Sequence, residues 1–172
     1  MKIKILEFPN DSDWVEVKRR ALVTVGKTPV TPPDDDWKIK ILESMHSPVR
    51  RLRFSFLLEN IPSYVSVHLV RHVHAQPYVK SQRNDRQDDY DRTTAPQNTP
   101  VNMIWDMNYE ELVNIMHKRL CGQADKATRE ICRQIRDAVI NADPIYAAFL
   151  VPQCEYLHRC PEVFKKTCDV KR

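Results

Sequence analysis

Hydrophobic and polar positions alternate along two stretches of the chain, the pattern of β-strands that bury one face. Residues 2–8 and 53–59 both show this period of two, and Phe54, Phe56 and Leu58 form the apolar side of the second stretch. Lysines occupy polar positions of the first stretch, as is typical of an edge strand. We therefore expect two strands, the first at a sheet edge.

Other stretches repeat their apolar positions every three or four residues, which predicts helices. The first is expected from a cap at Asp11 or Ser12 to about Gly26. The second is expected from Asp36 to about Met45, where a following Ser-Pro pair ends it, because the residue before proline disfavours helix.

A short helix capped by Ser63 is expected to lead to Arg71 and His72. On such a helix, His68 would share one face with these two residues. Residues 84–102 are polar and show no periodicity, which predicts an exposed loop, either a lid or a plain loop.

The C-terminal half has the strongest helical pattern. Asn108 begins an Asn-capped variant of the capping box. The buried stripe of the helix that follows is expected to comprise Tyr109, Leu112, Val113, Met116 and Leu120. Another helix is expected over residues 125–141, and the cysteine-bearing tail over about 152–172 is expected to be loop-rich.

The chain has 172 residues, which indicates one domain over residues 1–172 with a substantial core. Its net charge is only +4, and aspartates stand among the arginines of residues 83–92, so no basic stripe favours nucleic acid. No apolar run suits a membrane span or a signal peptide. Five cysteines, an odd number, favour reduced thiols in the cytoplasm.

Only two glycines occur in the whole chain. Neither the GxGxxG nor the GxxxxGK phosphate loop can therefore be written. Any phosphate must be held by side chains and helix ends.

Cationic side chains follow apolar residues directly in the stretch 67–86. Arg71 and His72 come straight after Leu69 and Val70. Guanidinium groups match phosphate oxygens with paired hydrogen bonds, so this stretch predicts an anion site. The alternative is a helix end whose cations complement the macrodipole. The arginines that would converge on one anionic ligand are Arg71, Arg83, Arg92 and Arg119.

Metal and nucleophile sites are weaker interpretations. His68, His72 and His74 have the spacing of metal ligands, but no HExxH glutamate is present and Arg71 would repel a cation. Ser81 lacks a GxSxG turn, which favours a hydrogen-bonding role. The remaining metal candidates lack a CxxC pair and are better read as buried thiols: Cys121, Cys154, Cys160 and Cys168, with His158. No metal is predicted.

Arg71-His72-Val73, seven further residues and then Ser81 resemble the RHR-x7-S signature of the flavin-dependent thymidylate synthases, the ThyX family. Further pieces resemble the family's pattern in the same order, over most of residues 1–165. They are His46-Ser47-Pro48, Phe54-Ser55-Phe56, Arg92 to Pro96, Asn108, Asn114, Arg119-Leu120-Cys121 and Ala127 to Ile131.

The chain departs from this pattern at three positions. Val73 stands in place of the second arginine, Val79 in place of an acidic residue, and His68 in place of a glutamine. The segment between the signature and Arg92 is also shortened.

The resemblance implies an α/β (α+β) fold, with a central, mostly antiparallel sheet flanked by helices, in a homotetramer with active sites between subunits. It also implies that FAD accepts hydride from NADPH. A methylene group then passes from methylenetetrahydrofolate to carbon 5 of dUMP and is reduced to methyl, without an enzyme nucleophile on the ring.

The resemblance also assigns residues to ligands. The FAD-facing positions are Arg71, His72, Ser47, Asn108 and Asn114. The dUMP-facing positions are His68, Ser81, Arg83, Arg92 and Arg119. Arg119 is expected to polarise the pyrimidine, because a fixed guanidinium stabilises negative charge on the ring. Ser81 is the second catalytic candidate, and Arg83 and Arg92 suit the phosphate.

Two alternatives remain at this stage. The changes at Val73, Val79 and His68 fit a relative that methylates or hydroxymethylates another pyrimidine nucleotide. The basic stretch alone fits a non-catalytic homologue that binds a nucleotide or nucleic acid.

Overall fold

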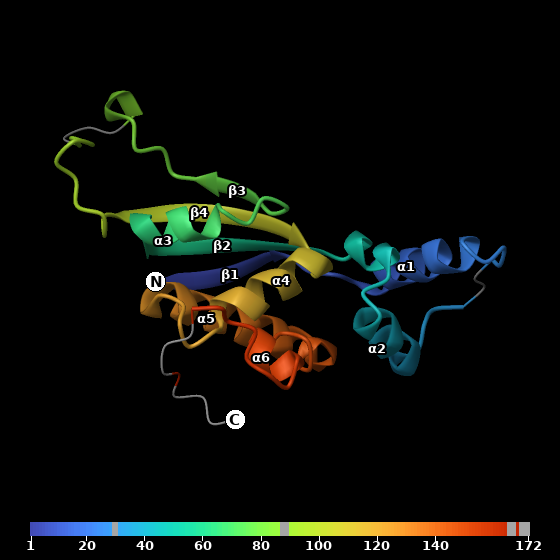
Figure 1. Ribbon diagram of the computed structural model, residues 1–172. Coiled ribbons are helices and arrows are strands. Elements are labelled where there is room, and N and C mark those ends of the chain that lie inside the picture. The colour runs from blue at the N-terminus through green and yellow to red at the C-terminus, as the bar shows by residue number, and fades with distance from the viewer. Residues whose placement is uncertain (29–30, 87–89, 165–167, 169–172) are drawn as a thin grey trace.

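The computed structural model describes residues 1–28, 31–86, 90–164 and 168. Parts of the predicted 84–102 loop and of the 152–172 tail therefore lie outside the described residues. One antiparallel sheet with strand order β1-β2-β4-β3 forms the centre of the fold (Figure 1). Its strands are β1 (Lys2–Glu7), β2 (Arg53–Pro62), β3 (Gln76–Val79) and β4 (Pro100–Asn108).

The two strands predicted from alternation are confirmed as β1, at an edge, and β2, next to it. The loop prediction for 84–102 is wrong at its C-terminal end, because β4 begins at Pro100. β4 alternates buried Val101, Met103 and Trp105 with more exposed positions, which is the same period-two pattern. β3 is a short edge strand with no such alternation.

The first helix, α1 (Asp11–Val23), has Asn10 as its cap, so the predicted caps at Asp11 or Ser12 are wrong. The Asn10 amide oxygen accepts hydrogen bonds from the backbone N–H groups of Ser12 and Asp13. The helix ends before the predicted Gly26, which has a φ of 69°.

The second helix, α2 (Asp35–Glu43), is capped by Asp34 and ends before Met45. The 3-10 helix η1 (Ser47–Arg51) then leads into β2. In Figure 1, α1 and α2 lie beyond one end of the sheet, away from the other helices.

Helix α3 (Ser63–Leu69) is shorter than predicted. Ser63 does not cap it, because its hydroxyl donates to the Gln97 carbonyl at 2.7 Å. Since α3 ends at Leu69, Arg71 and His72 lie in the turn after it. The prediction that they share a helix face with His68 is therefore wrong.

The two strongest helix predictions are confirmed as α4 (Tyr109–Arg119) and α5 (Lys126–Ala142). Their cap residues are Asn108 and Asp125, and the predicted stripe of α4 is buried. The remaining short elements are η2 (Asn84–Arg86), η3 (Pro144–Tyr146) and α6 (Gln153–Tyr156).

The hydrophobic core joins the sheet to both groups of helices. Tyr146 packs against Phe54 of β2 with ring centroids 5.5 Å apart and edge-to-face geometry. It also contacts Trp14 of α1 and Tyr109 of α4. Within the described ranges, no helix has the length and apolar character needed to cross a bilayer.

The core makes a direct stability prediction. Replacing the fully buried Leu58 by alanine should lower the free energy of unfolding by about 2–5 kcal/mol, because it leaves a cavity. The matched change Leu6→Ala, on a side chain that is 45% exposed, should alter it by about 0.5 kcal/mol or less. Chemical denaturation measures both, and equal effects would contradict the assigned register of β2.

Candidate functional site

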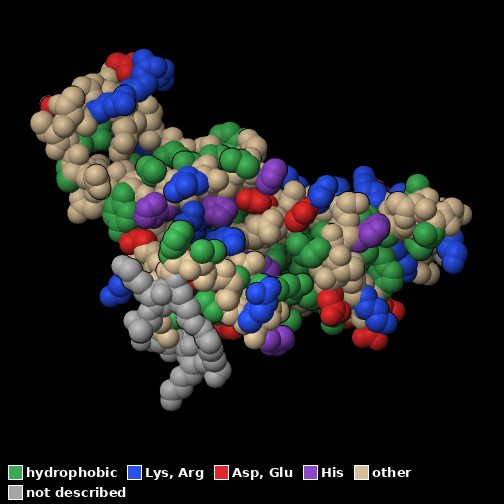
Figure 2. Space-filling model, in the orientation of Figure 1, with side chains coloured by type: hydrophobic (Ala, Val, Ile, Leu, Met, Phe, Trp, Pro, Cys, Tyr) green, Lys and Arg blue, Asp and Glu red, His purple; other side chains and the backbone are tan. Residues whose placement is uncertain are grey.

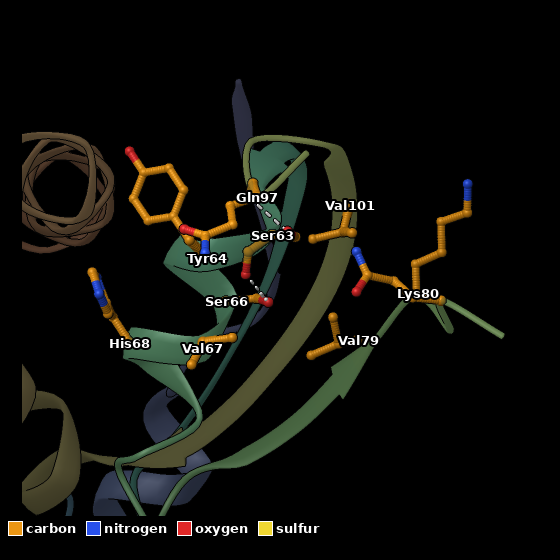
Figure 3. Close-up of a pocket in the computed structure, with 10 residues that line it drawn as sticks. Ser63, Tyr64, Ser66, Val67, His68, Val79, Lys80, Gln97 and Val101 are labelled. Carbon is orange, nitrogen blue, oxygen red and sulfur yellow. Dashed lines mark hydrogen bonds between the residues drawn. The ribbon is translucent and has the colours of Figure 1, made fainter. Parts of the chain in front are cut away.

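A groove of about 480 Å³ lies between α3 and the end of β3 (Figure 3). Tyr64 and His68 come from α3, and Val79 and Lys80 come from the end of β3. In Figure 3, the side chains of Tyr64 and His68 point to the side of α3 away from Val79, and Lys80 extends away from the helix. The groove thus combines apolar walls with a few polar groups, as small-molecule sites do.

Arg119, at the end of α4, contacts the end of α3 and the turn that follows it. Its Nε donates to Nε2 of His72 at 3.0 Å, and its Nη2 donates to the His68 carbonyl at 2.8 Å. The charge of Arg71 is close enough to lower the pKa of both His72 and Arg119. The structure therefore brings together His68, Arg71, His72 and Arg119 from the predicted set.

His72 is neutral at physiological pH. Burial, and then the charges of Arg119 and Arg71, lower its pKa from 6.5 to about 4. Since its Nε2 accepts from Arg119, its Nδ1 carries the hydrogen and faces the Glu111 carboxylate at 3.4 Å. His72 is thus an uncharged bridge between a cation and an acid.

Glu111 is a buried carboxyl that sequence patterns did not single out. Burial raises its pKa, although the Asn114 side chain hydrogen-bonds to it and His74 lies near. Its backbone N–H donates to the Asn108 side chain at 2.9 Å, so Asn108 acts as the cap of α4. Asn108 and Asn114 therefore both contact Glu111, and their FAD-facing roles remain predictions.

Ser47 is exposed at the start of η1. η1 is held to α4 by an ion pair between Arg50 and Glu110. The structure thus places Ser47 near the N-terminal end of α4, whereas Arg119 is at the other end.

The segment between β3 and β4 projects beyond the sheet, away from α4 (Figure 1). It carries Ser81, Arg83 and Arg92, all of them exposed. One chain therefore does not bring Arg83 and Arg92 to Arg119, and the predicted convergence of the arginines does not occur within a single chain.

The groups on this projecting segment have local partners. Nε and Nη2 of Arg83 donate to the two carboxylate oxygens of Asp85, each at 2.8 Å. The Arg83 backbone N–H donates to the Ser81 hydroxyl at 3.3 Å, and that of Arg92 donates to the Asn84 side chain at 3.1 Å. A phosphate at Arg83 would have to compete with Asp85.

A second polar group missed by sequence analysis is Thr128, which is fully buried on α5. Its Oγ1 is 2.8 Å from Nδ1 of His68, sixty positions away in the chain. The sequence shows the local cap pattern from Asp125 to Thr128, but no sequence pattern predicts the contact with His68.

Among the described residues, no three His, Cys, Asp or Glu side chains are grouped to hold a metal ion. The five cysteines are free thiols. Cys132 lies near Arg119, and burial raises the pKa of its thiol to about 12. That thiol stays protonated, and a protonated thiol is a poor nucleophile.

The family model described as thymidylate synthase complementing protein matches residues 87–145. This segment includes β4, α4 and α5 and therefore Arg119. A crystal structure of ThyX from Helicobacter pylori, with FAD and dUMP, matches with a TM-score of 0.69 and 12% identity, over 90% of this chain and 99% of that chain. The family match over residues 87–145 and the shared fold support membership of the ThyX family. No curated protein sequence matches the chain.

The lowered pKa of His72 predicts that the stability of the protein depends on pH. The His72 pKa of about 4 in the fold, against 6.5 ordinarily, means that unfolding takes up a proton between these values. Stability contributed by neutral His72 is thus present above pH 6.5 and lost as the pH falls to 4, by about 3 kcal/mol at most. The raised pKa of Glu111 acts in the opposite direction.

Denaturation at pH 4.5 and 7 should therefore show a smaller pH-dependent loss in His72→Asn than in the unmodified protein. His46→Asn changes an exposed histidine and serves as the matched control. An equal loss in all three proteins would show that His72 is not buried in its neutral form.

Proposed function

We propose that this chain is an FAD-dependent thymidylate synthase, which methylates dUMP reductively to dTMP with methylenetetrahydrofolate and NADPH. The observation that carries the proposal is the cluster of Arg119, His72 and His68 beside a groove, in a ThyX fold. The solved relative contains FAD and dUMP, which supports the same pair of ligands here.

A positive charge suited to the diphosphate of FAD is available in this region. Arg71 is exposed and has no ion-pair partner among the described residues, so its guanidinium is available to a diphosphate. Val73, in place of the family's second arginine, is 77% exposed and adds no charge. Arg71 would therefore hold the cofactor, which supplies hydride chemistry when bound. Both ring nitrogens of His72, in contrast, are already engaged by Arg119 and Glu111.

The residues near Arg119 also fit the proposed chemistry on dUMP. The Arg119 guanidinium is held in place by two hydrogen bonds, and it would stabilise negative charge that develops on a pyrimidine ring. The buried, protonated thiol of Cys132 offers no nucleophile there. This agrees with a reaction that forms no bond between the enzyme and the ring.

We further propose a homotetramer with sites shared between subunits. Arg83 and Arg92 belong to the segment between β3 and β4, which projects beyond the sheet and away from α4 (Figure 1), so a second copy is needed to bring them to an Arg119 side chain. Apolar side chains gather along the edge of the sheet around β3 (Figure 2). Val73 and Tyr78, 77% and 61% exposed, belong to this edge, and exposed apolar clusters are typical of interfaces.

A second candidate substrate is another pyrimidine nucleotide. Val79 lines the groove where the family pattern has an acidic residue, so the ligand contacts of the groove differ from that pattern. Assays with UMP and dCMP beside dUMP separate the candidates.

A cytoplasmic location, one working domain and the lack of a nucleic-acid partner remain predictions from the sequence.

Absorption spectroscopy tests the cofactor and substrate together. Added FAD should bind and then bleach with NADPH, and dUMP with methylenetetrahydrofolate should yield dTMP. Arg119→Ala should lower turnover about 100-fold or more, because it removes a fixed charge at the ring. Arg133→Ala, on an exposed part of α5, should leave turnover unchanged. A protein that takes up no FAD would favour the non-catalytic homologue.

Mixing two inactive variants tests the shared site. Arg119→Ala and Arg92→Ala subunits, unfolded together and refolded, should regain part of the activity, because some hybrid sites have both arginines. Each variant refolded alone should stay inactive. If the mixture gains nothing although light scattering shows tetramers, both residues serve the same subunit's site.

A further inference from the structure

A chain of hydrogen bonds runs from the beginning of α5 to His68. The Thr128 backbone N–H donates to Oδ1 of Asp125 at 2.9 Å, and the Thr128 hydroxyl donates to the same oxygen at 3.0 Å. The Thr128 oxygen is also 2.8 Å from Nδ1 of His68. Thr128 is fully buried, so water does not reach its hydroxyl, whereas Asp125 at the start of the chain of bonds is exposed.

The direction of these bonds follows from the hydrogens available. The bonds from Thr128 lower the pKa of Asp125, whose ionised carboxylate can only accept. The threonine hydroxyl has one hydrogen, and it is directed to Asp125. The Thr128 oxygen must therefore accept the hydrogen on Nδ1 of His68.

The reverse arrangement is unfavourable. If the hydroxyl donated to His68, its lone pairs would face the Asp125 carboxylate oxygen at 3.0 Å without a hydrogen between them. Two acceptor oxygens at this distance repel each other, and the repulsion is stronger when one belongs to an ionised carboxylate. Neutral His68 is thus held with its hydrogen on Nδ1 and a lone pair on Nε2.

The imidazole ring is also fixed in orientation. Tyr64 contacts it edge-to-face, with centroids 5.8 Å apart. Among the described residues, Nδ1 is the ring nitrogen of His68 that has a hydrogen bond, and the ring lies on the side of α3 away from Val79 and Lys80 (Figure 3). Nε2 is left to accept a hydrogen bond from a ligand.

We propose that His68 selects the pyrimidine base by accepting the N3–H of a uracil ring on Nε2, with Thr128 and Asp125 as positioning residues. This rests on the proposed function, because it assumes a pyrimidine nucleotide bound beside the His68 ring. Cytosine has a lone pair at N3, which Nε2 would repel. Sites that leave a polar group unpaired discriminate strongly against the wrong ligand.

The tautomer is measured first, by ¹⁵N NMR of histidine-labelled protein at pH 8, with His68 assigned through its loss in His68→Gln. The unmodified protein and Thr128→Ser should both show hydrogen on Nδ1, because both have the hydroxyl. Thr128→Val should lose this preference. Hydrogen on Nε2 in the unmodified protein would overturn the proposal, whatever the protein binds.

Calorimetric titration of the FAD-supplied protein with dUMP and with dCMP tests the selection. The unmodified protein and Thr128→Ser should bind dUMP about tenfold or more tightly than dCMP, since one hydrogen bond is exchanged for a repulsion. In Thr128→Val this ratio should shrink toward one. An unchanged ratio in Thr128→Val would refute selection by His68.

The NMR and binding measurements distinguish failure of the proposed function from failure of the proposed role of His68. Binding of neither nucleotide would reject the proposed function and with it the selection of uracil. The NMR result would still decide whether Thr128 and Asp125 hold the tautomer. Thermal melting of Thr128→Val and Thr128→Ser shows whether both variants remain folded.

Discussion

The Arg119 guanidinium is the charge on which the candidate site depends. It ends α4 and reaches the turn after α3, where it donates to His72 and to the His68 carbonyl. A partly buried cation needs such partners, because desolvation is costly without them. Burial is the larger cause of the lowered pKa of His72, and the charge of Arg119 adds to it. The hydrogen bond from Arg119 sets which nitrogen of that ring carries hydrogen, so one interaction fixes the turn and the donor pattern.

The sheet and the C-terminal helices keep Arg119 in position. β4 leads directly into α4, so the pairing of β2 with β4 sets where α4 begins. Tyr146 packs between Phe54 and Tyr109 and thereby holds the sheet against α4. α5 then places Thr128 beside His68. The side chains of the site belong to packed elements, and rigid elements hold functional groups more accurately than loops do.

A single chain presents two separate surfaces. One contains Arg119, His72 and His68 beside the groove, and the other is the projecting segment with Arg83 and Arg92 (Figure 1). The exposed valines and Tyr78 near β3 lie between them in the chain. In a symmetric assembly, the projecting segment of one copy would lie beside the Arg119 cluster of another copy. The proposed tetramer would account for the separation of these cations within one chain.

The sequence by itself determined the elements whose signals are local. Asn108 and Asp125 cap α4 and α5 through side chains that reach only three residues ahead, and the apolar stripe of α4 repeats at helical spacing. Arg119 and His72 were predicted to be site residues from a family resemblance, while Glu111 and Thr128 were not. Only the tertiary structure decided their contacts, since Arg119 meets His72 across 47 positions and Thr128 meets His68 across 60. The neutral state of His72 likewise arises from burial, which depends on how the elements pack and not on the neighbours in the chain.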